Sequence, residues 1–256
     1  MRCSTAGWRK VFRLRWSRYA IRSPQPTSRG SLQKACHSTH LSRRSPRSAP
    51  ALVLLAVKPQ AMTSVLPELA PLVSPETVFL SIAAGMGLHR LQELLGAEVH
   101  AVRSMPNTPA AIGRGITVAC ANTRVTPEQK VLADNLLAAV GEVGWVENEA
   151  LIDAVTAISG SGPAYVFYMV ECLAAAGEAL GLDADLAMKL ARETVSGSGE
   201  MLHRMEESAS ELRINVTSPG GTTAAALDVL MGEGGLSPLM RRTALAARDR
   251  ARELGK

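Results

Sequence analysis

The feature that most constrains the fold of this chain is an unbroken aliphatic run, VLLAV at residues 53–57, which Lys58 and Pro59 bring to an end. An apolar run of this length is typical of a strand that is buried on both faces of a parallel sheet. A helical pattern follows directly, over residues 60–72. Because parallel strands are joined by helical crossover connections, the sequence predicts an α/β sheet. It also raises the question of which residues supply the strands that should precede this one.

The alternation of strand and helix patterns continues to residue 148. Further strand patterns occupy residues 77–85, 99–105, 115–121 and 142–147, and further helix patterns occupy residues 88–96 and 127–141. Such alternation predicts a mostly parallel, doubly wound sheet. Residues 149–256 instead show helical periodicity, interrupted by SGSGP (159–163) and TSPGGTT (217–223). We therefore predict an α/β domain at residues 51–148 and an all-helical domain at residues 149–256.

Residues 1–50 differ in composition from the rest of the chain. They hold 12 basic residues and no acidic residue, and they are rich in serine. This is the composition of an organelle transit peptide, and residues 8–22 have the pattern of a basic amphipathic helix. Two other interpretations stay open, a disordered basic tail and translation from a wrong start or reading frame. We treat residues 1–50 as a basic leader of doubtful structure and expect no strand in it.

The composition of residues 51–256 argues against several classes of function. The whole chain carries 28 Lys+Arg and 23 Asp+Glu, but outside the leader 16 basic residues face 23 acidic ones. An acidic folded part does not favour nucleic-acid binding. No apolar run reaches the roughly 18–20 residues of a membrane helix, and the four dispersed cysteines imply neither disulfides nor a zinc site. We expect no nucleic acid, membrane or metal as a partner, and a reducing compartment.

Two candidate binding loops follow strand patterns. Lys58 stands at the end of residues 53–57, and Asn107 and Thr108 lie between two prolines in SMPNTP at residues 104–109. Ligands of open α/β sheets bind beyond the carboxyl ends of the strands, so Lys58 could reach a phosphate or ribose of a dinucleotide. A polar loop stiffened by prolines suits a nicotinamide or substrate contact. The alternatives are a solvated lysine before a turn and a plain loop.

Two stretches of glycine and hydroxyl residues precede helix patterns, at residues 158–163 and 217–223. Free amides and the helix dipole attract anions to helix N-termini, so the pair suggests a site for a substrate carboxylate, with Ser161 and Ser218 at its corners. The alternative is that Ser and Thr only cap the helices. The helix at about residues 163–180 is apolar on most faces, which predicts burial between two subunits or in a large monomeric core.

The folded part lacks the patterns of hydrolysis and phosphoryl transfer. Its histidines are His89, His100 and His203, none of them in a recognisable nucleophile pattern, and it contains no Gly-Lys-Ser/Thr loop. Hydride delivery to an already electrophilic carbon needs little side-chain acid–base chemistry, because the cofactor supplies the reactivity. The sequence favours such a reaction.

The motifs LAVKPQ, SIAAG, SMPNTPA, DAVTAISGSGPAYVF and INVTSPGGTT, in this order and spacing, closely resemble the pyrroline-5-carboxylate reductase family. The resemblance runs from about residue 52 to residue 254. It implies a Rossmann-like domain followed by a helical domain through which two chains interlock as a homodimer, often within a larger homo-oligomer. It also implies reduction of 1-pyrroline-5-carboxylate to L-proline with NADPH or NADH. The implied location is the cytoplasm, or the mitochondrion if the leader is a true transit peptide.

The resemblance assigns roles to individual residues. The implied cofactor contacts are Val57, Lys58, Pro59, Ala84, Asn107 and Asn215. The implied substrate contacts are Glu206, Ser218, Gly220, Gly221, Thr222 and Thr223. Thr223 is implied to be catalytic, since its hydroxyl would hydrogen-bond the ring nitrogen of the substrate. Neither a metal nor a buried general base is required.

Residues 1–50 depart from the family pattern. Family members open with a strand and a glycine-rich G-x-G-x-x turn, whereas residues 1–50 contain no G-x-G. A transit peptide would precede that turn and not replace it, so the sequence favours a wrong start or frame. We therefore expect Leu54 to lose its cover and the chain to bind NAD(P)H poorly or not at all, while the helical domain folds and pairs.

Two other functions stay open. An inactive assembly subunit of the same family would keep the dimer helices and lack cofactor binding. A hydroxyacid-dehydrogenase-like reductase would use a lysine of the helical domain for acid–base work, but Lys189 lies in a helix pattern away from the glycine-rich turns. Activity on a 2-hydroxy acid would support this second alternative.

Overall fold

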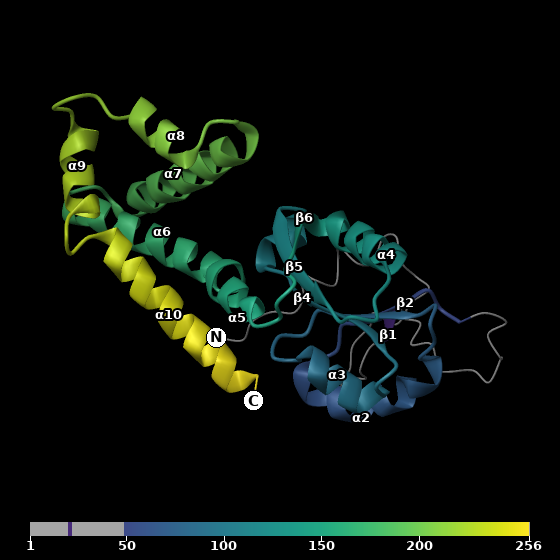
Figure 1. Ribbon diagram of the computed structural model, residues 1–256. Helices are drawn as coiled ribbons and strands as arrows, with labels where there is room; N and C mark the ends of the chain where they lie inside the picture. Colours follow the sequence, from purple (N-terminus) through teal and green to yellow (C-terminus); the bar gives the residue numbers. More distant parts are fainter. Residues whose placement is uncertain (1–19, 22–48, 256) are drawn as a thin grey trace, which may run out of the picture. The chain divides into compact units, whose positions relative to one another are not determined.

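Figure 1 presents a computed structural model of the chain, which describes residues 20–21 and 49–255. The chain forms two compact units, Met1–Gly160 with Arg248–Lys256 and Ser161–Ala247. In the described residues the first unit contains the sheet, and the second contains helices. The expected division into an α/β part and a helical part is confirmed.

A single sheet forms the centre of the first unit. Its strands among the described residues are β1 Ala20–Ile21, β2 Leu52–Leu55, β3 Val78–Ser81, β4 His100–Met105, β5 Gly115–Ala121 and β6 Gly141–Trp145. Their order across the sheet is their order along the chain. β4 and β5 pair antiparallel, and every other neighbouring pair is parallel. The prediction of a mostly parallel sheet is confirmed.

Helices cover both faces of this sheet. They are α2 Pro59–Leu69, extended by η1 Ala70–Leu72, α3 Leu88–Leu95, and α4 Pro127–Leu137, extended by η3 Ala138–Val140. α2 and α3 lie against one face and α4 against the other (Figure 1). Neighbouring residues of a strand point to opposite faces. Phe79 therefore shares a core with Leu91 of α3, whereas Leu80 shares the second core with Leu136 of α4. The doubly wound arrangement is confirmed.

The strand predicted at residues 51–57 has a neighbour on each side. β2 pairs with β3, and on its other edge Ala20 and Ile21 of β1 pair with Leu54 and Leu55. The expectation that the leader holds no strand is therefore wrong at residues 20–21. An open edge of a parallel strand offers unpaired amides and carbonyls. Ala20 and Ile21 pair with this edge of β2, although the sequence around them has the pattern of a basic helix. The remainder of that predicted helix lies outside the described residues.

Leu54 keeps its cover, contrary to expectation. Its side chain is 8% exposed and belongs to the cluster on the α4 face, with Leu80, Val102 and Leu136. The expectation was wrong because it assigned the cover of Leu54 to a preceding strand. The buried residues that form this cluster with Leu54 all follow it in the chain.

The unit built on the sheet continues past residue 148, where the sequence placed a boundary, to Gly160. The extra segment comprises α5 Leu151–Val155 and the π-helical turn η4 Thr156–Gly160. Ile152 is 1% exposed and lies in the core shared with α2 and α3. Residues 156–160 are thus helical and not an open glycine turn, but α6 begins directly after Ser161 with Pro163 in its first turn, as expected. The hydroxyls of Thr156 and Ser159 donate hydrogen bonds to the carbonyl oxygens of Ile152 and Val155, one helical turn earlier.

The helices after Gly160 are α6 Gly162–Ala179, α7 Ala184–Arg204, α8 Ala209–Asn215, α9 Thr222–Met231 and α10 Leu236–Leu254. α6 and α7 form an antiparallel pair that is held close by small residues. A Cβ added at Gly177 would lie 3.1 Å from the Cβ of Ala187, and Ala174, Ala187 and Ala191 are all buried. Gly181, with φ of 96°, makes the turn between the two helices.

α6 is not covered by its own chain. Its apolar side chains include Val166, Phe167, Tyr168, Met169 and Leu173, which are between 42% and 66% exposed, and Ala174 is its one buried residue. Within the described residues, the helices of the second unit do not enclose α6 in a core. A set of this size on one helix is typical of a surface that is covered by another protein. Measured by length and hydropathy, no helix in the described part of the chain could span a bilayer.

Candidate functional site

The carboxyl ends of β2, β3 and β4 meet at one edge of the sheet, because the three strands are parallel. The segments that leave this edge are residues 56–58, 82–87 and 106–107. The predicted cofactor residues of the first unit all lie in or directly after these segments, namely Val57, Lys58, Pro59, Ala84 and Asn107. Ligands of open α/β sheets bind at such an edge, so the fold brings these five residues to the expected place.

Lys58 and Pro59 form the start of α2. Lys58 is the N-cap residue with an extended backbone, Pro59 is the first helical residue, and no side chain among the described residues caps this end. Val57 is buried, whereas the side chain of Lys58 is exposed. Uncapped amides, the positive end of the helix dipole and a lysine charge thus occur at one place. This combination can hold a phosphate group.

Two buried serines fix the start of the loop after β3. Ser104 Oγ donates to Ser81 O at 2.9 Å, and Ser81 Oγ accepts from Ala83 N at 3.3 Å. Ala84 is then exposed, and Gly85 follows with φ of 77°, a conformation that favours glycine. The chain therefore turns directly after a small exposed side chain.

Asn107 holds the loop after β4. Its Oδ1 accepts a hydrogen bond from Ile116 N of β5 at 3.0 Å, and its backbone forms the N-cap of the short helix η2 Thr108–Ile112. The same amide that the family resemblance assigns to the cofactor therefore also ties two strands together. This structural role is not visible in the motif.

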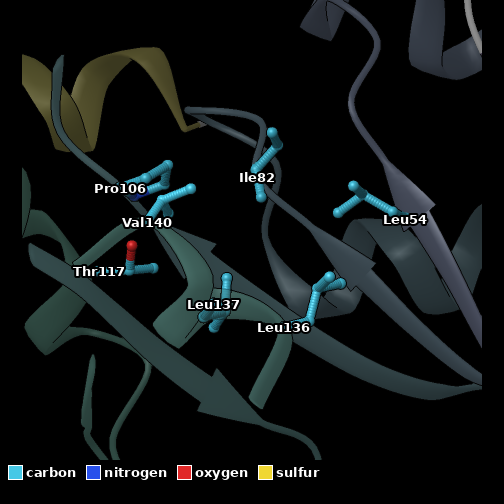
Figure 2. A pocket seen from close by; sticks show the side chains of 7 residues that line it. All are labelled: Leu54, Ile82, Pro106, Thr117, Leu136, Leu137 and Val140. Atoms are coloured by element: carbon cyan, nitrogen blue, oxygen red, sulfur yellow. The ribbon is translucent and has the colours of Figure 1, made fainter. Parts of the chain in front are cut away.

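A small apolar pocket lies beside this loop. Figure 2 shows the side chains that line it, which are Leu54, Ile82, Pro106, Thr117, Leu136, Leu137 and Val140. Its cavity volume is about 10 Å³, the space of roughly one water molecule. A nicotinamide or pyrroline ring does not fit, so this pocket is a gap in the core packing.

A polar cluster that the sequence analysis missed lies next to the same edge. Glu149 Oε1 accepts from Leu88 N at 2.8 Å and from Arg103 Nη1 at 2.9 Å. Arg103 Nη2 is also 3.8 Å from Asp153 Oδ1, and Asp153 Oδ2 is 3.9 Å from Arg252 Nε. A cavity of about 300 Å³ borders this cluster and the loop glycines Gly85 and Gly87. The one signal in the sequence was a charged residue, Arg103, inside a strand pattern.

The TSPGGTT segment forms a tight turn before α9. Gly221 N donates to Ser218 O at 3.0 Å, and Gly220 between them has φ of 69°. Gly221 is the N-cap of α9, and no described side chain caps this end. Thr222 and Thr223 occupy the first turn, Thr222 exposed and Thr223 half-buried. Amides and hydroxyls thus surround one helix N-terminus, which can receive a carboxylate.

Glu206 precedes α8, and Asn215 is the last residue of this helix, which leads into the turn. Both side chains are exposed. At the start of α8, Ser208 Oγ accepts from Glu211 N at 3.3 Å and Ser208 N donates to Glu211 Oε2 at 2.7 Å, a capping box. The hydrogen bond from the Ser208 side chain holds the pKa of the Glu211 carboxyl below its usual value. This box fixes the start of the helix whose last residue is Asn215.

The predicted residues therefore form two sets, each within one compact unit. One set lies at the carboxyl edge of the sheet, and the other lies around α8 and the start of α9. Ser161, the other predicted corner, is the N-cap of α6 with a helical backbone. Across the described residues, no group of three or more His, Cys, Asp or Glu side chains could hold a metal ion.

Comparison with known proteins identifies the family. Residues 149–254 match the family described as pyrroline-5-carboxylate reductase dimerisation. The pyrroline-5-carboxylate reductase of Pseudomonas aeruginosa is 43% identical over 205 residues, which make up 80% of this chain and 75% of that protein. The chain belongs to the pyrroline-5-carboxylate reductase family. The resemblance inferred from the motifs is confirmed.

Solved structures of this family share the fold. The pyrroline-5-carboxylate reductase of Coxiella burnetii has a TM-score of 0.76 at 41% identity, over 80% of this chain and 76% of that chain. The pyrroline carboxylate reductase of Plasmodium falciparum, solved with NADP bound, has a TM-score of 0.68 at 32% identity, over 80% of this chain and 78% of that chain. The expected α/β domain followed by a helical dimerisation domain is the fold of this family.

Proposed function

We propose that this chain reduces 1-pyrroline-5-carboxylate to L-proline, with NADPH or NADH as the hydride donor. The observation that carries the proposal is its 43% identity to the Pseudomonas aeruginosa reductase. The NADP bound to the Plasmodium falciparum relative supports the choice of cofactor. The substrate is a small cyclic imine, and its reduction forms one C–H bond at the imine carbon.

The residues at the sheet edge fit a nicotinamide dinucleotide. Lys58 and the uncapped start of α2, at Pro59, offer a positive site for phosphate. Val57, Ala84 and Asn107 border the same edge. Asn215 is the proposed contact from the helical unit. When bound, the cofactor supplies the hydride, so these residues only need to hold and orient it.

The turn before α9 is the proposed substrate site. The amide of Gly220 and the first-turn amides of α9, which start at its N-cap Gly221, would hold the carboxylate together with the hydroxyls of Ser218 and Thr222. The Thr223 hydroxyl would hydrogen-bond the ring nitrogen and so fix the face of the imine that receives the hydride. A protonated imine needs no further proton to accept the hydride, so no general base is required. Glu206, which lies shortly before α8 in the chain, is a further proposed substrate contact.

We also propose that the chain works as a homodimer or a larger homo-oligomer. The support is the match of residues 149–254 to a dimerisation family, together with the exposed apolar residues of α6, such as Phe167 and Tyr168. We propose the cytoplasm as the location, since a reducing compartment suits Cys120 and Cys172, which are both free thiols. Fractionation of cells that express the untagged chain would test this location against the mitochondrion.

Replacement of the Thr223 hydroxyl tests the proposed reaction. Thr223→Val keeps the shape of the side chain but removes the hydrogen bond to the ring nitrogen, so kcat/KM for pyrroline carboxylate should fall about 100-fold. Thr223→Ser keeps the hydroxyl and should stay within about threefold. The assay follows the consumption of NADPH, present at millimolar concentration. Equal rates for the Val and Ser variants would remove Thr223 from the reaction.

The same assay separates the two rival functions. An inactive assembly subunit is favoured by the apolar surface of α6 and by the lack of a G-x-G turn in residues 1–50. It predicts no NADPH consumption, and co-purification with an active family member. A hydroxyacid-type reductase predicts activity on a 2-oxo acid that depends on Lys189. Lys189 is exposed within α7 and distant in sequence from the turn at residues 217–223, which gives this rival no support.

A further inference from the structure

The carboxylate of Glu149 joins three segments that are far apart in the chain. Its Oε1 atom accepts from Leu88 N at 2.8 Å, across 61 positions, and from Arg103 Nη1 at 2.9 Å, across 46 positions. Leu88 is the first residue of α3, Arg103 lies in β4, and Glu149 lies just before Ala150, the N-cap residue of α5. A single oxygen atom therefore ties the start of α3 and the strand β4 to the connection that leads into the helical region.

The hydrogen bond to Leu88 acts on the loop that carries Ala84. Residues 82–87 connect β3 to α3, and the two serines at the end of β3 and β4 fix the loop at its first end. Gly87 has no side chain, and a Cβ added there would lie 3.3 Å from Glu149 Oε1. Glu149 thus lies directly over the second end of the loop, where it also supplies the acidic group that favours a helix N-terminus.

Arg103 keeps this carboxylate in place. Its side chain is 13% exposed, against 31% for Glu149, so the pair is partly withdrawn from water and its hydrogen bond is charge-assisted. Asp153 lies on the other side of the guanidinium, at 3.8 Å. An arginine inside a strand is costly to bury alone, and here two acids balance it.

We propose that Glu149, held by Arg103, is a positioning residue that sets residues 82–87 for the nicotinamide nucleotide. This inference rests on the proposed function, because it assigns the loop around Ala84 to the cofactor. Without the carboxylate, the first amide of α3 loses its acceptor, and the second end of the loop is held only by the apolar packing of Met86 and Leu88. The loop should then sample positions that do not fit the cofactor, which weakens cofactor binding without changing the reacting groups.

Three variants test the proposal. Glu149→Ala removes both hydrogen bonds, Glu149→Gln keeps an oxygen acceptor in the same place, and Glu147→Ala removes a nearby exposed carboxylate as the matched control. We expect Glu149→Ala to raise the KM and the dissociation constant for NADPH about tenfold, with kcat at saturating NADPH unchanged within about twofold. Glu149→Gln should recover most of the affinity, and Glu147→Ala should match the natural chain.

A merely structural role predicts a different result, a lower kcat in proportion to the lost folded fraction and an unchanged KM for NADPH. That result would overturn the proposal. Hydrogen exchange at the Leu88 amide gives a readout that needs no cofactor, and it should accelerate at least tenfold in Glu149→Ala alone. Unchanged exchange would also overturn the proposal. If the natural chain exchanges as expected but neither binds NADPH nor reduces the imine, the proposed function fails instead, and with it the cofactor role of the loop.

Discussion

At the scale of single residues, the amide of Asn107 has a structural hydrogen bond besides its proposed contact to the cofactor. Asn107→Ala leaves Ile116 N, in a partly buried strand, without the acceptor that lies 3.0 Å away. The free energy of unfolding should fall by about 1–2 kcal/mol, and the KM for NADPH should rise. Urea denaturation and NADPH-dependent kinetics measure the two effects.

Asn135→Ala is the control for this substitution, since Asn135 is exposed on α4 and alanine suits a helix. It should leave both quantities unchanged or raise the stability slightly. An Asn107→Ala variant that is as stable as the natural chain would contradict the structural role of this residue.

The predicted site residues lie in short sequence motifs, whereas the residue that the sequence analysis missed depends on contacts between distant parts of the chain. Lys58, Ala84 and Thr223 lie in short motifs, so the family resemblance could select them from a local stretch of sequence. Glu149 has its partners 61 and 46 positions away. Its role depends on which strand ends beside which helix, and that is settled only when the sheet forms.

At the scale of the elements, replacing either of two glycines at element boundaries by alanine should lower the free energy of unfolding by different amounts. Gly141, the first residue of β6, has φ of 141°, and a Cβ there would lie 2.0 Å from Gly115 O. Gly141→Ala should therefore destabilise the chain by more than about 3 kcal/mol. Gly113 has φ of 73° but open space around it, so Gly113→Ala should cost about 1–2 kcal/mol. Urea denaturation compares the two, and equal costs would show that the strand pairing at Gly141 is looser than described.

The capping box of α8 predicts a dependence of stability on pH. Because the pKa of Glu211 lies below its usual value of 4.5 in the folded chain, its carboxylate stabilises the fold fully above about pH 4.5, and this stabilisation is lost as the pH falls through the folded pKa. Glu211→Gln should therefore be less stable than the natural chain near pH 7, and the difference should shrink as the pH falls through the folded pKa of Glu211. Urea denaturation near pH 7 and near pH 3 measures the difference. Glu207→Gln, at an exposed position next to the box, is the control and should show no such change.

The elements themselves were largely predictable. Strands and helices of the first unit follow runs and periodicities whose structural meaning is local, such as residues 53–57 and 115–121. Two features were not predictable. The pairing of Ala20 and Ile21 with β2 depends on an edge that the leader sequence does not indicate, and the π-helical turn at residues 156–160 follows from the packing of α5 on the sheet, since glycine and serine by themselves favour a loop.

At the scale of the whole molecule, the surface of α6 predicts an oligomer. Phe167 is 61% exposed in the single chain, and a dimer would bury it. Phe167→Asp would place a charge in that interface, so the molecular mass from light scattering should shift towards the monomer at micromolar concentration. Val131→Asp, at a site on α4 that is 59% exposed, is the matched control and should not change the mass. A monomeric natural chain would contradict the proposed assembly.

The composition of residues 1–50 leads to the last prediction, which concerns cofactor binding by the whole chain. These residues contain no G-x-G turn, and such a turn normally brings the cofactor pyrophosphate to a helix N-terminus. Lys58 and the start of α2 remain, so binding should be weak and not reach saturation at micromolar NADPH. A fluorescence titration measures the affinity of the natural chain.

The control for this titration is a chimera in which the N-terminal segment of the Pseudomonas aeruginosa reductase replaces residues 1–50. Restoring the turn should tighten binding by about 100-fold, the equivalent of roughly two charge-assisted hydrogen bonds. Both proteins retain Lys58, Ala84 and the α9 turn, so a gain in affinity would come from the replaced segment alone. Micromolar affinity in the natural chain would contradict this prediction.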